Sequence, residues 1–143
     1  MENLLKIAKE ILEIKSGASL TGTLMLKLRG IDLGREPKDI DILICDYAPN
    51  IKFPEGFEFE SRGFASDGCG ARYEHKGIII DVLSDGEQPE NVNGWSLGTV
   101  EKLIQAKFHY SKQNNESAEK HHNDLVKLGF IFPEPKDDFD LPF

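Results

Sequence analysis

Two aspartates separated by one residue are the feature of this sequence whose type and spacing most directly suggest chemistry. Asp39 and Asp41 open an apolar segment that runs to Cys45, a pattern typical of a strand emerging from a covered sheet. Alternate residues of a strand share a face, so the two carboxylates project together and repel each other. A shared divalent cation would relieve this repulsion, and Mg²⁺ prefers such hard oxygen ligands. A solvated strand end is the commoner explanation of an isolated pair.

A third acid, Asp81, interrupts the apolar segment Ile78–Leu83. Burying an unpaired carboxylate in a strand would cost several kcal/mol unless a cation or hydrogen bonds compensate. If the two strands are neighbours in the sheet, we expect Asp81 to converge with Asp39 and Asp41 on one cation.

Groups that could bind phosphate lie before the aspartates. Gly22 and Thr23 stand between a short predicted strand and a helix, where glycine lets the backbone approach an anion and the first amides of the helix attract it. Arg35 could contact a phosphate or pair with Asp39. Lys107 and Lys120, on two later predicted helices, could reach phosphates or lie on solvated helix faces.

The elements that position these residues are predicted from apolar spacing and turn residues. Helices are expected over residues 3–15, 24–28, 99–111 (with Thr99 as N-cap) and 117–128. Strands are expected over residues 18–21, 39–45, 57–60, 71–75 and 78–83, with a loop over 84–98. This pattern predicts an α/β (α+β) fold, a small mixed β-sheet flanked by helices.

Length and composition bound the function. The 143 residues suit one domain, expected over residues 1–130, followed by an acidic, proline-containing tail over 131–143. A formal net charge of -8 argues against binding long nucleic acid through a basic face. No apolar run approaches the ~20 residues of a membrane span, and no signal peptide is evident, so we expect a cytoplasmic protein. Neither Cys45 nor Cys69 suggests a role.

The order of these features resembles the nucleotidyltransferase superfamily. That family has a strand ending in Gly-Gly or Gly-Ser, a helix, an Arg, an Asp-hydrophobic-Asp motif on the next strand and a lone Asp on a later strand. The corresponding residues here are Leu20-Thr21-Gly22-Thr23, Arg35, Asp39-Ile40-Asp41 and Asp81. The resemblance covers roughly residues 1–130 and is nearest to minimal nucleotidyltransferases, including the AbiEii toxin type and small antibiotic nucleotidyltransferases. The segment Lys120–Leu125 matches a late helix of that subgroup in part.

The resemblance implies a function. Asp39 and Asp41 would bind Mg²⁺ or Mn²⁺ bridging a nucleoside triphosphate, and Asp81 would complete a second metal position or activate the attacking hydroxyl. Gly22 and Thr23 would hold the phosphates. The acceptor would be a small molecule or a protein, and a homodimer is compatible with the pattern. The alternative is a catalytically reduced binding module that acts as a regulatory or toxin–antitoxin partner, which Thr23 in place of the usual Gly or Ser favours.

Overall fold

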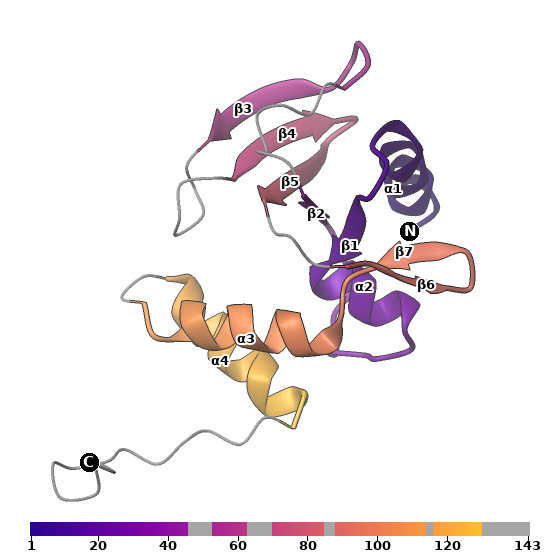
Figure 1. Ribbon diagram of the computed structural model, residues 1–143. Coiled ribbons are helices and arrows are strands. Elements are labelled where there is room, and N and C mark those ends of the chain that lie inside the picture. Colours follow the sequence, from indigo (N-terminus) through magenta and orange to yellow (C-terminus); the bar gives the residue numbers. More distant parts are fainter. Residues whose placement is uncertain (46–52, 63–69, 85–87, 114–115, 130–143) are drawn as a thin grey trace, which may run out of the picture. The chain divides into compact units, whose positions relative to one another are not determined.

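The computed structural model describes residues 1–45, 53–62, 70–84, 88–113 and 116–129. The chain divides into two compact units, Met1–Leu103 and Ile104–Phe143, whose helices and strands are labelled in Figure 1. The tail predicted over residues 131–143 lies outside the described residues, and the domain boundary at residue 130 stays a prediction.

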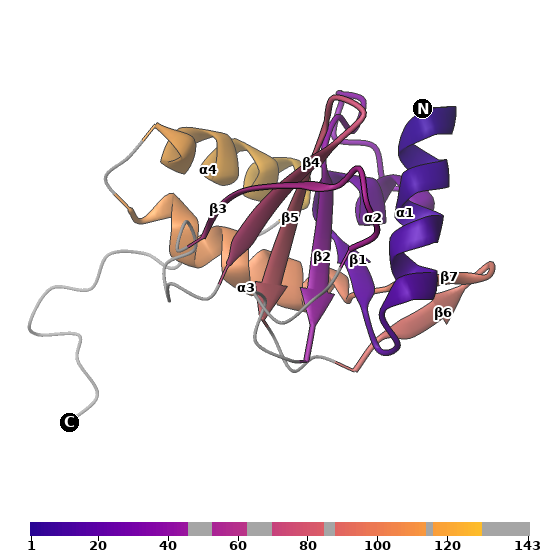
Figure 2. The ribbon, with the colours of Figure 1, turned by 90° about the horizontal axis from the view of Figure 1, so that it is seen from above.

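The first unit begins with two helices that the apolar spacing predicts. Helix α1 spans Glu2–Ile14 and buries a stripe formed by Leu4, Ile7, Ala8 and Ile11, whereas Ile14 at its end is exposed. Helix α2 spans Gly22–Leu28 and starts two residues earlier than expected. Both views show α1 on the β1 side of the sheet (Figures 1 and 2).

A mixed sheet forms the centre of the first unit. Its order is β3-β4-β5-β2-β1-β7-β6. The strands are β1 (Ser19–Thr21), β2 (Ile40–Ile44), β3 (Glu58–Arg62), β4 (Ala71–His75), β5 (Ile78–Ser84), β6 (Glu90–Val92) and β7 (Trp95–Leu97). Strand β2 runs antiparallel to β1 and parallel to β5, and β7 runs parallel to β1. The structure thus confirms the mixed sheet flanked by helices.

The register of the sheet brings the apolar core residues into rows. Leu20, Ile42, Val82 and Ala71 are successive Cα partners across β1, β2, β5 and β4. All four side chains are fully buried. Because neighbouring residues of a strand point to opposite faces, the next row along these strands points away from this core.

The loop expected over residues 84–98 was a wrong prediction in its second half. Strands β6 and β7 form an antiparallel hairpin in which Val92 pairs with Trp95. The two intervening residues, Asn93 and Gly94, both have positive φ angles, of 51° and 85°. Asn-Gly is the preferred sequence of a two-residue hairpin turn, because both central residues must adopt that conformation. Strands β6 and β7 are too short to show an alternating pattern, so only the Asn93-Gly94 dipeptide indicated this hairpin in the sequence.

Two further helices follow the sheet. Helix α3 spans Val100–Ser111, and Thr99 caps it as predicted, since its Oγ1 accepts a hydrogen bond from the backbone N–H of Lys102 at 3.1 Å. Helix α4, in the second unit, spans Ser117–Lys127. None of the described helices has the length and apolar character that a bilayer crossing requires.

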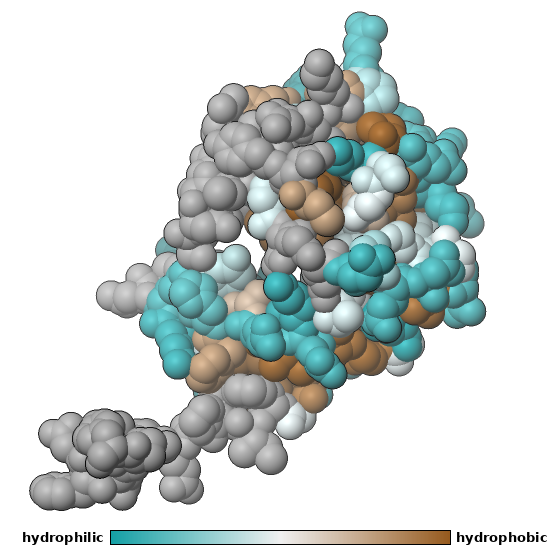
Figure 3. Space-filling view, viewed as in Figure 1, coloured by the Kyte–Doolittle hydropathy of each residue, from teal (hydrophilic) through white to brown (hydrophobic). Residues whose placement is uncertain are grey.

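Few large hydrophobic side chains are exposed among the described residues. They are Met1, Ile14, Phe59 and Val126. Figure 3 shows one face of the protein, on which hydrophilic residues border smaller hydrophobic areas.

Candidate functional site

One row of polar side chains crosses four strands next to the buried apolar row. Thr21 on β1 pairs with Asp41 on β2, Asp41 pairs with Asp81 on β5, and Asp81 pairs with Arg72 on β4. Cross-strand partners share a face, and neighbouring strands lie about 4.8 Å apart. The sheet therefore brings two of the three predicted acids side by side.

Asp41 lies against Gly22, the first residue of α2. A Cβ atom added to Gly22 would overlap the Asp41 carboxylate, whose Cγ would lie 3.1 Å from it. Gly22 has a φ of +70°, a left-handed conformation that glycine adopts without the steric cost of a side chain. Glycine at this position thus allows a carboxylate and the start of a helix to meet.

Asp81 is held by Arg72. The Nε of Arg72 donates to Oδ1 of Asp81 at 2.7 Å, and Nη2 donates to Oδ2 at 3.1 Å. This is a bidentate, charge-assisted pair, the strongest geometry between these two groups. The side chain of Asp81 is 14% exposed and that of Arg72 is 39% exposed. Arg72 therefore compensates the free-energy cost of placing the Asp81 carboxylate within a strand.

Asp39 lies one residue before β2 rather than inside it, so the prediction of a strand starting at Asp39 was wrong by one residue. Its side chain is exposed and its backbone forms a bend. The strict alternation that orients Asp41 therefore does not extend to Asp39.

Two of the predicted phosphate-binding residues contact each other. The Nη2 of Arg35 donates a hydrogen bond to Oγ1 of Thr23 at 3.2 Å. Thr23 is the second residue of α2 and follows Gly22. Arg35 therefore brings a positive charge to the start of α2, and this contact is one that the sequence did not predict.

The carboxylate oxygens of Asp39 and Asp41 are of the type that binds a magnesium ion. Asp39 and Asp41 supply hard oxygen atoms, and Mg²⁺ is commonly bound by one or two carboxylates together with substrate phosphates. Within the residues that the structure describes, no three His, Cys, Asp or Glu side chains gather closely enough to hold a metal ion. In this arrangement Asp39, Asp41 and Asp81 do not form a three-acid group, and Asp81 is bound to Arg72 instead.

The second unit holds a buried ion pair. Lys107 on α3 donates to Oδ2 of Asp124 on α4 at 2.8 Å, and the two side chains are 6% and 2% exposed. The Nδ1 of His121 lies 3.4 Å from the Lys107 ammonium. Lys120, by contrast, is exposed. The two lysines predicted to bind phosphate thus have different surroundings, and Lys107 joins two helices.

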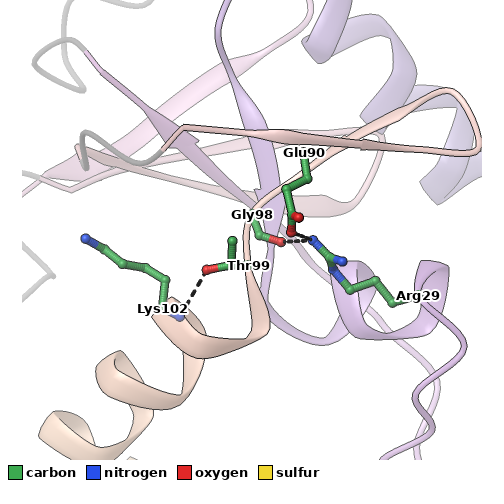
Figure 4. Close-up of polar contacts among 5 residues, drawn as sticks. All are labelled: Arg29, Glu90, Gly98, Thr99 and Lys102. Atoms are coloured by element: carbon green, nitrogen blue, oxygen red, sulfur yellow. Dashed lines mark hydrogen bonds and ion pairs between the residues drawn. The ribbon is translucent and has the colours of Figure 1, made fainter.

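Arg29, at the end of α2, is hydrogen-bonded to two residues of a later segment. Its Nη2 donates to the backbone carbonyl of Gly98 at 2.6 Å and to Oε1 of Glu90 at 2.7 Å (Figure 4). Gly98 precedes Thr99, the N-cap of α3. One guanidinium therefore joins the end of α2 to β6 and to the entry of α3.

Sequence reasoning missed Arg72, although a signal for it was present. The strands predicted over residues 71–75 and 78–83 leave only Lys76 and Gly77 between them, and the structure pairs His75 with Ile78 across this turn. Three residues further from the turn on each strand, this pairing sets Arg72 opposite Asp81. Asp124 and Arg29 had no comparable signal, because their partners lie on elements whose packing the sequence does not specify.

The fold of the chain is similar to that of known proteins, although its sequence is not. No family model matches the chain, and no curated protein sequence matches it. Among solved structures, one from Thermotoga maritima, assigned provisionally as a nucleotidyltransferase, superimposes with a TM-score of 0.57 and 18% identity over 90% of this chain and 92% of its own. An antigenic nucleotidyltransferase-like protein from Paracoccidioides brasiliensis gives 0.52 and 17% over 89% and 73%. The chain therefore has the fold of the nucleotidyltransferase-like proteins.

Proposed function

We propose that the chain is a metal-dependent nucleotidyltransferase, which transfers a nucleoside monophosphate from a nucleoside triphosphate to an acceptor hydroxyl and releases pyrophosphate. The observation that carries the proposal is the contact between the Asp41 carboxylate and Gly22 at the junction of β1 and α2. It sets a potential metal ligand beside backbone amides that can bind phosphate, and a metal–triphosphate complex needs both.

In this proposal Asp39 and Asp41 hold Mg²⁺ or Mn²⁺. The bound cation supplies charge neutralisation of the triphosphate. The backbone at Gly22 and Thr23 binds and orients the phosphates. Arg35, already bonded to Thr23, adds a positive charge where negative charge develops on the transferred group.

Asp81 then has one of two roles in the proposal, as base for the acceptor hydroxyl or as part of a second metal position. Lys120 is exposed, and its ammonium group can donate hydrogen bonds to a phosphate. The phosphate contact predicted for Lys107 would require its pair with Asp124 to open. The acceptor is proposed to be a small molecule or a protein, and a homodimer remains part of the proposal.

A binding module with the same fold, acting as a regulatory or toxin–antitoxin partner, is the second candidate. The observation that favours it is the pairing of Asp81 with Arg72, which leaves the described residues without a three-acid group. Such a module would keep the fold without metal-dependent binding of a triphosphate and without turnover.

Titration calorimetry with each of the common nucleoside triphosphates distinguishes the two candidates. The enzyme proposal expects at least one triphosphate to bind with a Kd below about 1 mM in the presence of Mg²⁺ and far more weakly in the presence of a chelator. Absence of metal-dependent binding of any triphosphate at that concentration would favour the module.

A further inference from the structure

We propose that the side chain of Thr23 is a positioning group, which acts on a bound triphosphate through Arg35 and not by contacting the phosphates itself. The inference rests on the proposed function and deepens it, because it assigns separate roles to the backbone and the hydroxyl of Thr23. It also gives a threonine a purpose at a position where the resembling family has glycine or serine.

The contact between the two side chains has a defined direction. Nη2 of Arg35 lies 3.2 Å from Oγ1 of Thr23. Arginine has no hydrogen-bond acceptor, so the guanidinium donates and the hydroxyl accepts. Threonine is β-branched and has few χ1 rotamers in a helix, so its hydroxyl is held within a narrow range of positions. Thr23 therefore presents a fixed acceptor to a long side chain that has many rotamers.

The loop that carries Arg35, residues 30–38, is anchored to the first unit before it reaches this residue. The backbone N–H of Ile31 donates to the carbonyl of Leu26 in α2 at 2.8 Å. Leu33 is 2% exposed and is part of the core. One backbone bond and one buried side chain thus fix the path of the chain just before Arg35.

Two consecutive residues of this loop bind one face of α2. Thr23 and Lys27 lie four residues apart in the helix, so they share a face. Arg35 binds Thr23, and Glu36 binds Lys27 with a distance of 3.3 Å between Nζ and Oε1. Of these two contacts, the one at Thr23 is next to Gly22. The Arg35 guanidinium is therefore held at the end of α2 where the proposed function places the phosphates.

A hydroxyl orients a cation without cancelling its charge. The bond to Thr23 uses one of the five N–H donors of a guanidinium that is charged at any physiological pH. Arg72 differs, because both oxygens of the Asp81 carboxylate bind it and neutralise its charge. The bond to Thr23 therefore suits an arginine that is to meet an anion.

A double-mutant cycle tests whether Thr23 acts through Arg35. ATP, GTP, CTP and UTP are titrated with Mg²⁺ into the full chain by calorimetry, and the tightest is used for the variants. Arg35→Met should raise Kd at least about tenfold, since a charge-assisted bond is lost. Thr23→Val should raise it about two- to tenfold, the scale of ordering one long side chain. The double variant should bind as Arg35→Met does, because the hydroxyl then has nothing to position.

Two matched variants serve as controls. Thr23→Ser keeps the hydroxyl and should bind within about twofold of the parent. Lys27→Met breaks only the neighbouring exposed contact with Glu36 and should also stay within about twofold. Thermal unfolding reports whether each variant is folded, and Thr23→Ala, which removes the same hydroxyl, replaces Thr23→Val in the cycle if that variant does not fold.

The outcomes separate this inference from the proposed function. If Thr23→Val weakens binding as much in the Arg35→Met background as in the parent, the hydroxyl contacts the phosphates directly and the inference is overturned. An unchanged Kd in folded Thr23→Val, or an equal loss in Lys27→Met, would overturn it as well. These results leave the proposed function intact, whereas a parent that binds no triphosphate with Mg²⁺ would overturn both.

Discussion

Asp41 and Asp81 are direct partners in the parallel pairing of β2 with β5. The next residues along the two strands, Ile42 and Val82, are also partners and are completely buried. The same register therefore serves two purposes. It closes the apolar core on one face and sets two carboxylates side by side on the other, so that the site is a consequence of how the core packs.

Replacing Gly22 with alanine should displace Asp41. The added Cβ overlaps the Asp41 carboxylate and forces an L-residue into a φ of +70°, which costs about 1–2 kcal/mol. We expect urea unfolding to show at least this loss, and Mn²⁺ binding to weaken.

Gly17→Ala is the control for Gly22→Ala. Gly17 has a φ of +81° with nothing within 4 Å of the added Cβ, so its replacement reports the backbone cost alone. Introducing Gly22→Ala into an Asp41→Ala background should reduce the cost toward the Gly17 value. An equal cost in both backgrounds would mean that the overlap with Asp41 does not matter.

Substitutions at two adjacent residues of β2, Asp41 and Ile42, should have different effects on the free energy of unfolding. Ile42→Ala removes a fully buried side chain and should cost about 2–5 kcal/mol in the free energy of unfolding. Asp41→Asn removes one of two neighbouring like charges and should leave the stability of the metal-free protein unchanged or slightly higher. Chemical denaturation measures both. An Asp41→Asn variant that unfolds as readily as Ile42→Ala would make Asp41 a structural residue.

The fold was predictable from the sequence where apolar spacing was long or a turn was explicit. The stripe of α1 and the hairpin across Lys76 and Gly77 carried enough signal to be assigned. Strands β6 and β7, of three residues each, were too short to show alternation, and only Asn93-Gly94 marked them.

The site was predictable only in part, because its residues come from separate strands. The motif and the apolar run around Asp81 pointed to the acids, but the pairing of β2 with β5 joins residues about forty positions apart, and nothing local specifies such a register. Arg72 was different, since the turn of its own hairpin sets it opposite Asp81. Contacts of Arg29 and Lys107 depend on packing between elements, which local patterns do not encode.

Breaking the buried pair of the second unit should be costly. Lys107→Met leaves the Asp124 carboxylate, 2% exposed, without this partner, and the loss of one member of a buried pair costs about 3–5 kcal/mol. The double variant Lys107→Met with Asp124→Leu should recover most of this loss, because no charge is left buried. Thermal and urea unfolding of the three variants give the comparison.

Lys27→Met provides the matched control for this pair. Lys27 and Glu36 form an ion pair at 3.3 Å whose side chains are 37% and 69% exposed, and exposed pairs contribute at most about 1 kcal/mol. A cost for Lys107→Met as small as that for Lys27→Met would show that the buried pair does not stabilise the unit.

Arg29 should stabilise the first unit chiefly through its bond to a backbone carbonyl. Arg29→Met loses the bonds to Gly98 and Glu90, and a hydrogen bond to a charged group contributes about 1.5–3 kcal/mol. Glu90→Gln removes only the more exposed charge and should cost less than about 1 kcal/mol. Equal losses in the two variants, measured by urea unfolding, would assign the stabilisation to the ion pair instead.

Pyrophosphate release tests the central claim most directly. The purified chain is supplied with each nucleoside triphosphate, Mg²⁺ and a panel of hydroxyl acceptors, next to folded Asp39→Asn and Asp41→Asn variants. We predict metal-dependent release by the parent and a reduction of at least about a hundredfold in each variant, the scale on which loss of one preorganised electrostatic group acts. Release that is unchanged in the folded Asp41→Asn variant, or absent from the parent with every triphosphate, would contradict the account.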